Sequence, residues 1–204
     1  MSWLLSCSRP SKSLPGRYLG TKVEHMFAQQ SAQVVLGIDP GLTRCGYAVL
    51  QAQHASLPGV LALGVMTTAP TELLQHRLCA LQIDIERLIF ETQPQTIAIE
   101  QVFFQNNVRT AMSVGQVSGL VLAMASRLGI DVVQYTPSQV KSAVTGSGTA
   151  NKLQVQKMVQ QRLGLVSLPQ PADAADAAAI ALCHLAVAPL RSSIARAQST
   201  VGAQ

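Results

Sequence analysis

Short apolar segments that end in turn residues alternate along the chain with longer segments of helical periodicity. The first, Val34 to Ile38, is almost entirely apolar and stops at Asp39-Pro40-Gly41, which is typical of a buried strand followed by a turn. Two further segments, 45–51 and 59–67, follow after short breaks, and this spacing predicts an antiparallel meander. Two later strands are predicted at 96–99 and 132–135.

The predicted helices lie between and after these later strands. Apolar positions recur at helical spacing from about Pro70 until Pro94 ends the helix. Thr136 and Pro137 provide an N-cap and a proline at the first helical position. Helices are predicted at about 70–93, 108–128, 136–145, 151–163 and 171–187, the last ended by Pro189. Because parallel strands need helical crossovers, this order predicts an α/β fold with a mixed sheet.

The chain is long enough for one ordinary domain between two tails. Hydrophobic residues make up 48% of the 204 residues, which excludes a disordered protein. Residues 1–31 form a predicted flexible basic tail in which Met26 is a possible alternative start, residues 32–189 form the domain, and residues 190–204 form a second flexible tail. No uninterrupted apolar run reaches the roughly 18–20 residues that cross a membrane, so we expect no membrane partner.

The net charge of +5 comes from the two tails, since residues 1–31 carry four basic residues and one acid and the C-terminal tail adds Arg191 and Arg196. The middle of the chain is therefore neutral overall. Its basic residues gather between 101 and 165, against the single acid Asp131, and this half could face phosphates. The four cysteines form no C-x-x-C pair, so a zinc site is excluded and free thiols in a reducing cytoplasm are expected.

Four of the ten acidic residues lie at the ends or flanks of apolar segments. Asp39 and Glu100 each follow a predicted strand directly, and a carboxylate there is well placed for a site. A turn is the alternative for Asp39, because Asp-Pro-Gly is good turn chemistry; a solvated strand end is the alternative for Glu100. Asp173 and Asp176 are three residues apart, which puts both on one face of the last helix, and an N-cap explains only the first.

Divalent cations would remove the repulsion among these four carboxylates. Hard oxygen ligands suit Mg²⁺, or Mn²⁺ in its place. Two such ions about 3.5–4 Å apart can stabilise the attacking and the leaving oxygen in phosphodiester hydrolysis. The pattern therefore indicates a metal-dependent nuclease in which Asp39, Glu100, Asp173 and Asp176 are both metal ligands and catalytic residues.

Three motifs in order resemble the RuvC Holliday-junction resolvases: residues 37–41, 98–103 and 172–177. The resemblance covers about Val34 to Ala188. It implies a ribonuclease H-like fold, a mixed five-stranded sheet flanked by helices. It also implies a homodimer that makes paired symmetric nicks in four-way junction DNA during recombination and repair, in partnership with the branch-migration complex of RuvA and RuvB. The family's four catalytic carboxylates fall on the four acids named above.

The resemblance also carries over residues that contact DNA. Lys141 and Lys152 fall on two family lysines associated with DNA and catalysis, and surface lysines are the alternative. Phe103 falls on an aromatic residue that acts at the junction. In the same loop, Arg109 could hold a phosphate and either Phe103 or Phe104 could stack on an unpaired base; packing of the rings in the core is the alternative.

We therefore expect a Mg²⁺-dependent crossover junction endodeoxyribonuclease of the cytoplasm. A ribonuclease H-like nuclease acting on RNA or flaps is one alternative, and a non-catalytic junction-binding protein is another. A phosphotransferase of the actin and sugar-kinase type also begins with a Gly-Ile-Asp hairpin, but it needs two such subdomains, and this chain is too short for them. Junction-specific cleavage distinguishes the first expectation from the rest.

Overall fold

The computed structural model of the chain describes residues 32–53, 56–101 and 108–201. All of these residues belong to one compact unit. The N-terminal tail expected at residues 1–31 and the aromatic residues Phe103 and Phe104 lie outside the described residues.

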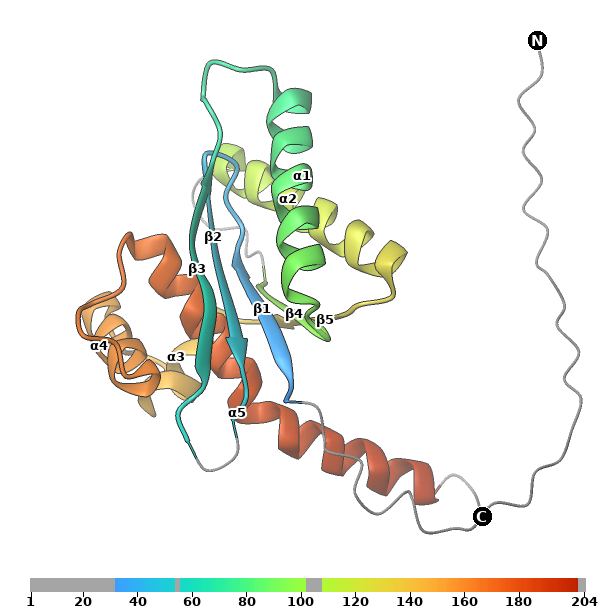
Figure 1. The fold of residues 1–204 in the computed structure, drawn as a ribbon, viewed down its shortest axis with the longest axis vertical. Helices are drawn as coiled ribbons and strands as arrows, with labels where there is room; N and C mark the ends of the chain where they lie inside the picture. The colour runs from blue at the N-terminus through green and yellow to red at the C-terminus, as the bar shows by residue number, and fades with distance from the viewer. Residues whose placement is uncertain (1–31, 54–55, 102–107, 202–204) are drawn as a thin grey trace, which may run out of the picture. The chain divides into compact units, whose positions relative to one another are not determined.

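A five-stranded mixed sheet forms the centre of this unit (Figure 1). The first three strands form an antiparallel meander, whereas β1 pairs with β4 and β4 with β5 in parallel. The order across the sheet is β3-β2-β1-β4-β5. The strands are β1 (Val34–Asp39), β2 (Arg44–Gln51), β3 (Gly59–Thr67), β4 (Thr96–Glu100) and β5 (Asp131–Tyr135). Both the meander and the mixed sheet predicted from the sequence are confirmed.

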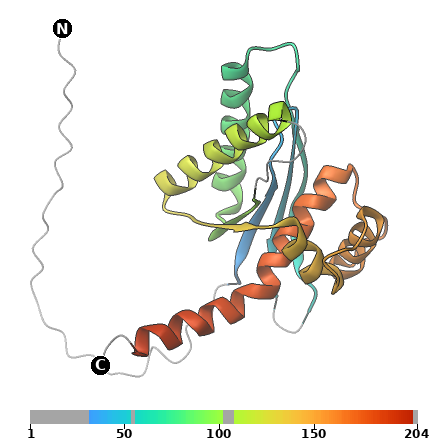
Figure 2. The same cartoon turned by 180° about the vertical axis from the view of Figure 1, so that it is seen from behind.

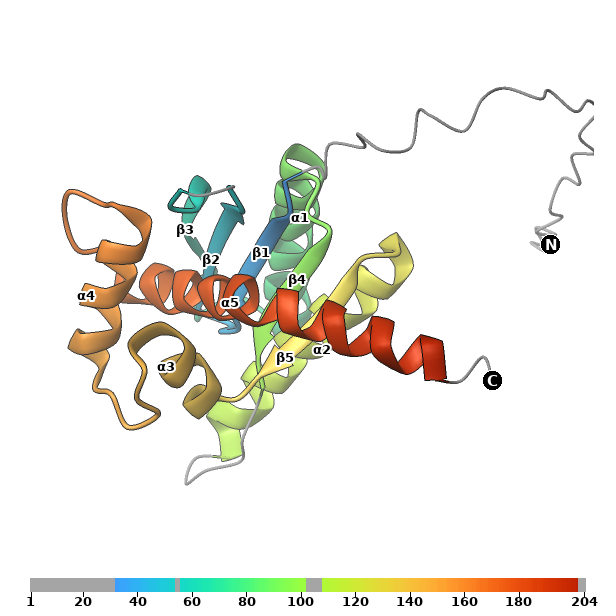
Figure 3. The same cartoon turned by 90° about the horizontal axis from the view of Figure 1, so that it is seen from below.

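Helices cover both faces of the sheet (Figures 1 and 3). One hydrophobic cluster joins one face to the first two helices, and a second cluster joins the other face to the last three. The helices are α1 (Leu74–Thr92), α2 (Val108–Leu128), α3 (Pro137–Thr145), α4 (Lys152–Leu163) and α5 (Ala172–Val201). The three-layer arrangement gives the central strands β1 and β4 two buried faces, which explains why both are continuously apolar.

Two capping boxes fix where α3 and α4 begin. The Thr136 side chain accepts a hydrogen bond from the Gln139 backbone, and the Gln139 side chain accepts one from the Thr136 backbone. Asn151 and Gln154 make the same reciprocal pair at α4. These bonds satisfy backbone donors that have no partner inside a helix. The α4 box places Lys152 at the first helical position.

The predicted end of the last helix was wrong. Pro189 was expected to end this helix near residue 187 and to leave residues 190–204 as a flexible tail, but α5 continues through Pro189 to Val201. Proline removes one backbone hydrogen bond and can bend a long helix without ending it, and the alanines and arginines that follow favour a helix. Figures 2 and 3 show α5 extending beyond the sheet.

Two helical windows, Ala111–Leu128 and Ala172–Pro189, are long and apolar enough to cross a membrane by length and composition alone. The second is 56% buried and packs across the sheet, as a core helix does. The first is only 33% buried. The consequence for the fold is that α2 covers the sheet with one side and presents apolar and small residues on its other side.

Candidate active site

Asp39 and Glu100 lie next to each other at one end of the sheet. β1 and β4 run parallel with Ile38 opposite Ile99, so the residues that follow occupy neighbouring positions. Ile38 and Ile99 pack in the cluster with α1 and α2. Because successive side chains of a strand point to opposite faces, Asp39 and Glu100 point to the face that α5 covers.

Two glycines allow α5 to approach that face closely. A Cβ atom on Gly37 would lie 2.3 Å from the Ala177 carbonyl oxygen, and one on Gly46 would lie 2.1 Å from the Asp173 carbonyl oxygen. Gly46 is also the residue paired with Asp39 across β1 and β2. The helix side of the contact is made of small buried residues: Ala174, Ala177, Ala178 and Ala181. Glycine facing alanine therefore brings the first turns of α5, with Asp173 and Asp176, beside the end of β1.

The electrostatics of Asp39 reflect this proximity. Burial and the negative charges of Asp176, Glu100 and Asp173, in decreasing order, raise the pKa of Asp39 from 3.8 to about 7. The positive charge of Lys152 acts in the opposite direction. Acids separated by more than 130 residues in the sequence therefore lie close enough for their charges to interact.

The pKa of Glu100 is raised in the same way, first by burial and then by the negative charge of Asp176. Lys141 and Lys152 lower it. Both lysines that the resemblance had marked therefore lie close enough to act on a carboxylate of the cluster. The structure brings them to the site from α3 and α4, on the same face of the sheet as α5.

Two basic side chains bind the carboxylates of α5. Arg44, at the start of β2, donates through Nε to Asp173 Oδ2 at 2.8 Å, and its Nη2 forms an ion pair with the same oxygen at 2.8 Å. Lys152 donates through Nζ to Asp176 Oδ2, also at 2.8 Å. This hydrogen bond is the main reason that the pKa of Lys152 is raised. Arg44 was not singled out from the sequence, although its position just after the Asp39-Pro40-Gly41 turn places it at the same end of the sheet.

The donor set fits a hard divalent cation. Carboxylate oxygens are the ligands that Mg²⁺ and Mn²⁺ prefer. Asp39 and Glu100 have raised pKa values, and Asp173 and Asp176 are paired with cations. They do not form a closed ligand set: among the described residues, no three acidic, histidine or cysteine side chains are grouped as a metal site would need. Asp173 and Asp176 are instead paired with Arg44 and Lys152. Within residues 32–53, 56–101 and 108–201, Asp39 and Glu100 are the two acids of the site that form no ion pair.

Other residues considered from the sequence lie elsewhere or are not described. Arg109 is in the first turn of α2, and its side chain is outside the described part. His184 is buried, and its ring nitrogens contact the Tyr135 hydroxyl at 2.9 Å and Gln33 Nε2 at 3.1 Å. Because Gln33 precedes β1 while Asp39 ends it, His184 lies toward the opposite end of the sheet from the carboxylates and belongs to the core.

Comparison with known proteins gives a consistent result. The family model described as "Crossover junction endodeoxyribonuclease RuvC" matches residues 35–184. The protein of that name from Frankia casuarinae is 47% identical over 151 residues, which cover 74% of this chain and 88% of that protein. The one from Rhodococcus opacus is 46% identical over 170 residues, covering 83% and 90% respectively.

Solved structures are similar as well. Thermus thermophilus RuvC in complex with a Holliday junction substrate superimposes with a TM-score of 0.74 at 37% sequence identity, over 78% of this chain and 96% of that one. The yeast mitochondrial Holliday junction resolvase Ydc2 superimposes with a TM-score of 0.59 at 16% identity, over 76% of this chain and 78% of that one, and this likeness concerns the fold alone.

Proposed function

This chain belongs to the RuvC family of crossover junction endodeoxyribonucleases, and we propose from this premise that it resolves four-way DNA junctions by paired symmetric nicks during recombination and repair. The relatives are named for this activity, and the solved relative holds a Holliday junction. The proposal assigns the catalysis to Asp39, Glu100, Asp173 and Asp176.

One observation carries this assignment. Three separate elements, β1, β4 and α5, bring their carboxylates to one end of the sheet. Burial, and after it the charges of the other three acids, raise the pKa of Asp39 to about 7. A protein that only bound junctions would gain nothing from such a cluster, because unneutralised carboxylates repel DNA phosphates. The cluster therefore favours catalysis over binding alone.

The proposed cofactor is Mg²⁺, two ions per site, with Mn²⁺ able to substitute. The four carboxylates would hold these ions. Bound there, they supply activation of the attacking water and neutralisation of charge on the departing 3′ oxygen. The chain itself fixes Asp39 and Glu100 at the strand ends and packs α5 closely against Gly37 and Gly46.

Lys152 and Lys141 are proposed to contact the scissile phosphate and its neighbours. Lys152 reaches Asp176 from the N-terminus of α4. An ammonium group there can donate to a phosphate oxygen as its negative charge develops in the transition state. Phe103 and Arg109 remain assigned to the DNA: the aromatic residue would stack on an unpaired base and the arginine would hold a phosphate.

Symmetric resolution needs two sites, and this chain supplies one. We assign the second to another copy of the chain, bound through the outer side of α2. That side exposes Met112, Gly115, Gly119 and Ala123 at helical spacing, and a Cβ on either glycine would meet nothing within 4 Å. Two such helices could cross closely, as small residues permit, and bury the apolar surface that each leaves open.

The wider setting follows from the substrate. Four-way junctions arise on chromosomal DNA, so the proposed location is the cytoplasm. The proposed partner is the branch-migration complex of RuvA and RuvB, which would present the junction to both subunits.

A substrate competition tests the function. The purified protein is incubated with Mg²⁺ and a mixture of labelled synthetic four-way junction, linear duplex, flap and RNA–DNA hybrid. We expect cleavage of the junction at two symmetry-related positions, giving nicks that DNA ligase seals. Preferential cleavage of the flap or the hybrid would assign a different ribonuclease H-like activity, and junction binding with no cleavage in Mg²⁺ or Mn²⁺ would assign a binding protein.

A further inference from the structure

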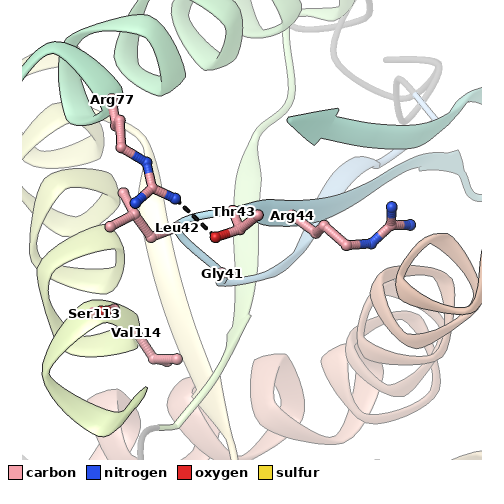
Figure 4. A pocket seen from close by; sticks show the side chains of 7 residues that line it. All are labelled: Gly41, Leu42, Thr43, Arg44, Arg77, Ser113 and Val114. Atoms are coloured by element: carbon pink, nitrogen blue, oxygen red, sulfur yellow. Dashed lines mark hydrogen bonds between the residues drawn. The ribbon is translucent and has the colours of Figure 1, made fainter. Parts of the chain in front are cut away.

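A pocket at the same end of the sheet as the carboxylate cluster shares one residue, Arg44, with that cluster. It has a volume of about 420 Å³ and is lined by the β1–β2 turn, the N-terminal part of α1 and the first turns of α2: Gly41, Leu42, Thr43, Arg44, Arg77, Ser113 and Val114 (Figure 4). Two of these residues are arginines and none is acidic. A positively charged pocket beside an acidic cluster is suited to an anion that belongs to the same substrate.

Arg77 is held in place at this pocket. Its Nε donates to Thr68 Oγ1 at 2.9 Å and its Nη2 donates to Thr43 Oγ1 at 2.7 Å. Thr68 is itself fixed, because its hydroxyl donates to the Leu42 carbonyl at 2.6 Å and its backbone N–H donates to the Thr43 carbonyl. The guanidinium therefore has a set orientation before any ligand arrives, which lowers the entropy cost of binding.

The other arginine of the pocket is committed elsewhere. Figure 4 shows the Arg44 side chain extending away from Arg77, and its guanidinium is bound to Asp173. Arg77, by contrast, is bound only to neutral hydroxyl groups among the described contacts. Within the part of the chain that the structure describes, no carboxylate is paired with Arg77. The Thr43 hydroxyl, which accepts from Arg77, can still donate its own hydrogen.

The β1–β2 turn connects the pocket to the cluster by a short length of chain. Gly41 follows Asp39 by two residues, which span at most about 7 Å of chain. A DNA strand carries one phosphate for about every 3.4 Å of helix axis. A strand whose scissile phosphate lies at Asp39 therefore brings a phosphate one or two nucleotides away to the β1–β2 turn.

We infer that this pocket is a second phosphate subsite, in which Arg77 and the Thr43 hydroxyl hold a backbone phosphate of the cleaved strand close to the cut. The inference rests on the proposed function and adds a positioning contact to it. Arginine is the suited residue, since its planar fork can donate two hydrogen bonds to one phosphate. By fixing a neighbouring phosphate, the subsite would set which phosphodiester bond reaches the carboxylates.

The test combines protein and substrate changes. After mapping the cut made by the wild-type protein, neutral methylphosphonate linkages are placed one at a time at the flanking phosphates, and junction affinity is measured in EDTA. We expect one linkage within two nucleotides of the cut to weaken wild-type binding about tenfold or more, the scale of a charged hydrogen bond. In Arg77→Gln the same linkage should have no further effect on junction affinity. The negative slope of the logarithm of the junction binding constant against the logarithm of the salt concentration should become shallower by about 0.9.

Matched variants separate this contact from general effects. Arg87→Gln removes the same charge from the same helix at an exposed position and should keep the full methylphosphonate profile. Thr43→Val removes one partner of Arg77 without changing charge and should weaken the effect of the same linkage. If Arg77→Gln does not fold, comparing the methylphosphonate profiles of the wild type and Thr43→Val still tests whether this pocket holds the phosphate.

A wild-type protein that cleaves junctions but shows equal sensitivity at all flanking phosphates overturns the subsite and leaves the function standing. Unchanged linkage profiles in Arg77→Gln or Thr43→Val overturn it also. A wild-type protein that neither binds nor cleaves a junction overturns the proposed function together with the inference.

Discussion

Gly37 of β1 lies directly under Ala177 of α5, so closely that a Cβ atom on the glycine would sit 2.3 Å from the alanine carbonyl oxygen and 2.9 Å from Ala181 Cβ. This contact sets the distance between the sheet, which carries Asp39 and Glu100, and the helix, which carries Asp173 and Asp176. The geometry of the carboxylate cluster therefore depends on a residue that carries no functional group.

The first prediction is that Gly37→Ala damages the site through this distance. The new methyl group meets backbone, which cannot turn aside, so α5 must move; overpacking of this kind costs about 1–3 kcal/mol. We expect a lower free energy of unfolding in urea and at least a tenfold loss of junction cleavage. Gly59→Ala is the control, because the one atom closer than 3.4 Å to its Cβ would be the end of the flexible Gln53 side chain. Equal activity of both variants would show that the close contact is not needed.

The second prediction concerns Lys152. Because its ammonium group occupies Asp176 Oδ2, Lys152→Met should free a carboxylate and increase the affinity of the metal-free protein for Mn²⁺, measured by calorimetry. Cleavage should nevertheless fall by about 10²–10³-fold, the scale of a lost transition-state donor. The Lys152 side chain is 60% accessible and that of Asp176 is 28% accessible, so solvent screens the pair and stability should change by less than about 1 kcal/mol.

Lys157→Met, which removes an exposed charge from the same helix, serves as the control for Lys152→Met. Lys157→Met should change neither the Mn²⁺ affinity nor the cleavage rate by more than about twofold, because exposed charges are screened by salt. Tighter Mn²⁺ binding with undiminished cleavage in Lys152→Met would assign the lysine to ion pairing alone.

The third prediction is a pH dependence of stability in EDTA. The pKa of Asp39 is raised from 3.8 to about 7 in the folded chain, so between these values the native state holds a proton that the unfolded state has lost. The free energy of unfolding should therefore fall as pH rises from about 4 to 7 and stay lower above that. Asp39→Asn should remove this part of the dependence and be the more stable protein at pH 8, by on the order of 2 kcal/mol.

The comparison protein for the pH series is Asp84→Asn, which changes a half-exposed acid of α1. Its stability curve should run parallel to that of the wild type. If Asp39→Asn also runs parallel to the wild type, the charge on Asp39 is not opposed by the other three acids, and the cluster does not act as a unit.

The fourth prediction concerns the outer side of α2. Gly119→Arg places a large charged side chain where a Cβ now meets nothing within 4 Å, so the fold should survive. If two copies meet there, sedimentation should show conversion of dimer to monomer, and junctions should be nicked singly rather than in symmetric pairs. Leu57→Arg, at an exposed leucine away from α2, should remain dimeric. A dimeric Gly119→Arg protein would move the interface elsewhere.

Much of the fold follows from local patterns in the sequence. The runs at Val34–Ile38 and Thr96–Ile99 show strands buried on both faces, and the caps at Thr136 and Asn151 fix helix starts within a few residues. The end of α5 was predicted too early, because Pro189 was expected to end the helix. The surrounding residues have high helix propensity, and the helix continues past the proline.

Part of the candidate site could also be predicted from the sequence, and part of it could not. Acids at strand ends and on one helix face could be found, since their positions have few structural explanations. The basic partners of Asp173 and Asp176 could not be found from the sequence, because Arg44 and Lys152 are 129 and 24 residues away from them along the chain. The role of Gly46 was hidden for the same reason: only the packed helix shows what a side chain there would displace.

The central claim is that four carboxylates from three elements act as one catalytic centre. Single-turnover cleavage of a synthetic four-way junction in Mg²⁺, measured for Asp39→Asn, Glu100→Gln and Asp176→Asn beside Asp84→Asn, tests it most directly. We expect each of the first three to lose at least about 10³-fold in rate while still binding the junction, as for residues that act as a unit, and Asp84→Asn to match the wild type. Cleavage by Asp39→Asn at the wild-type rate would contradict the account.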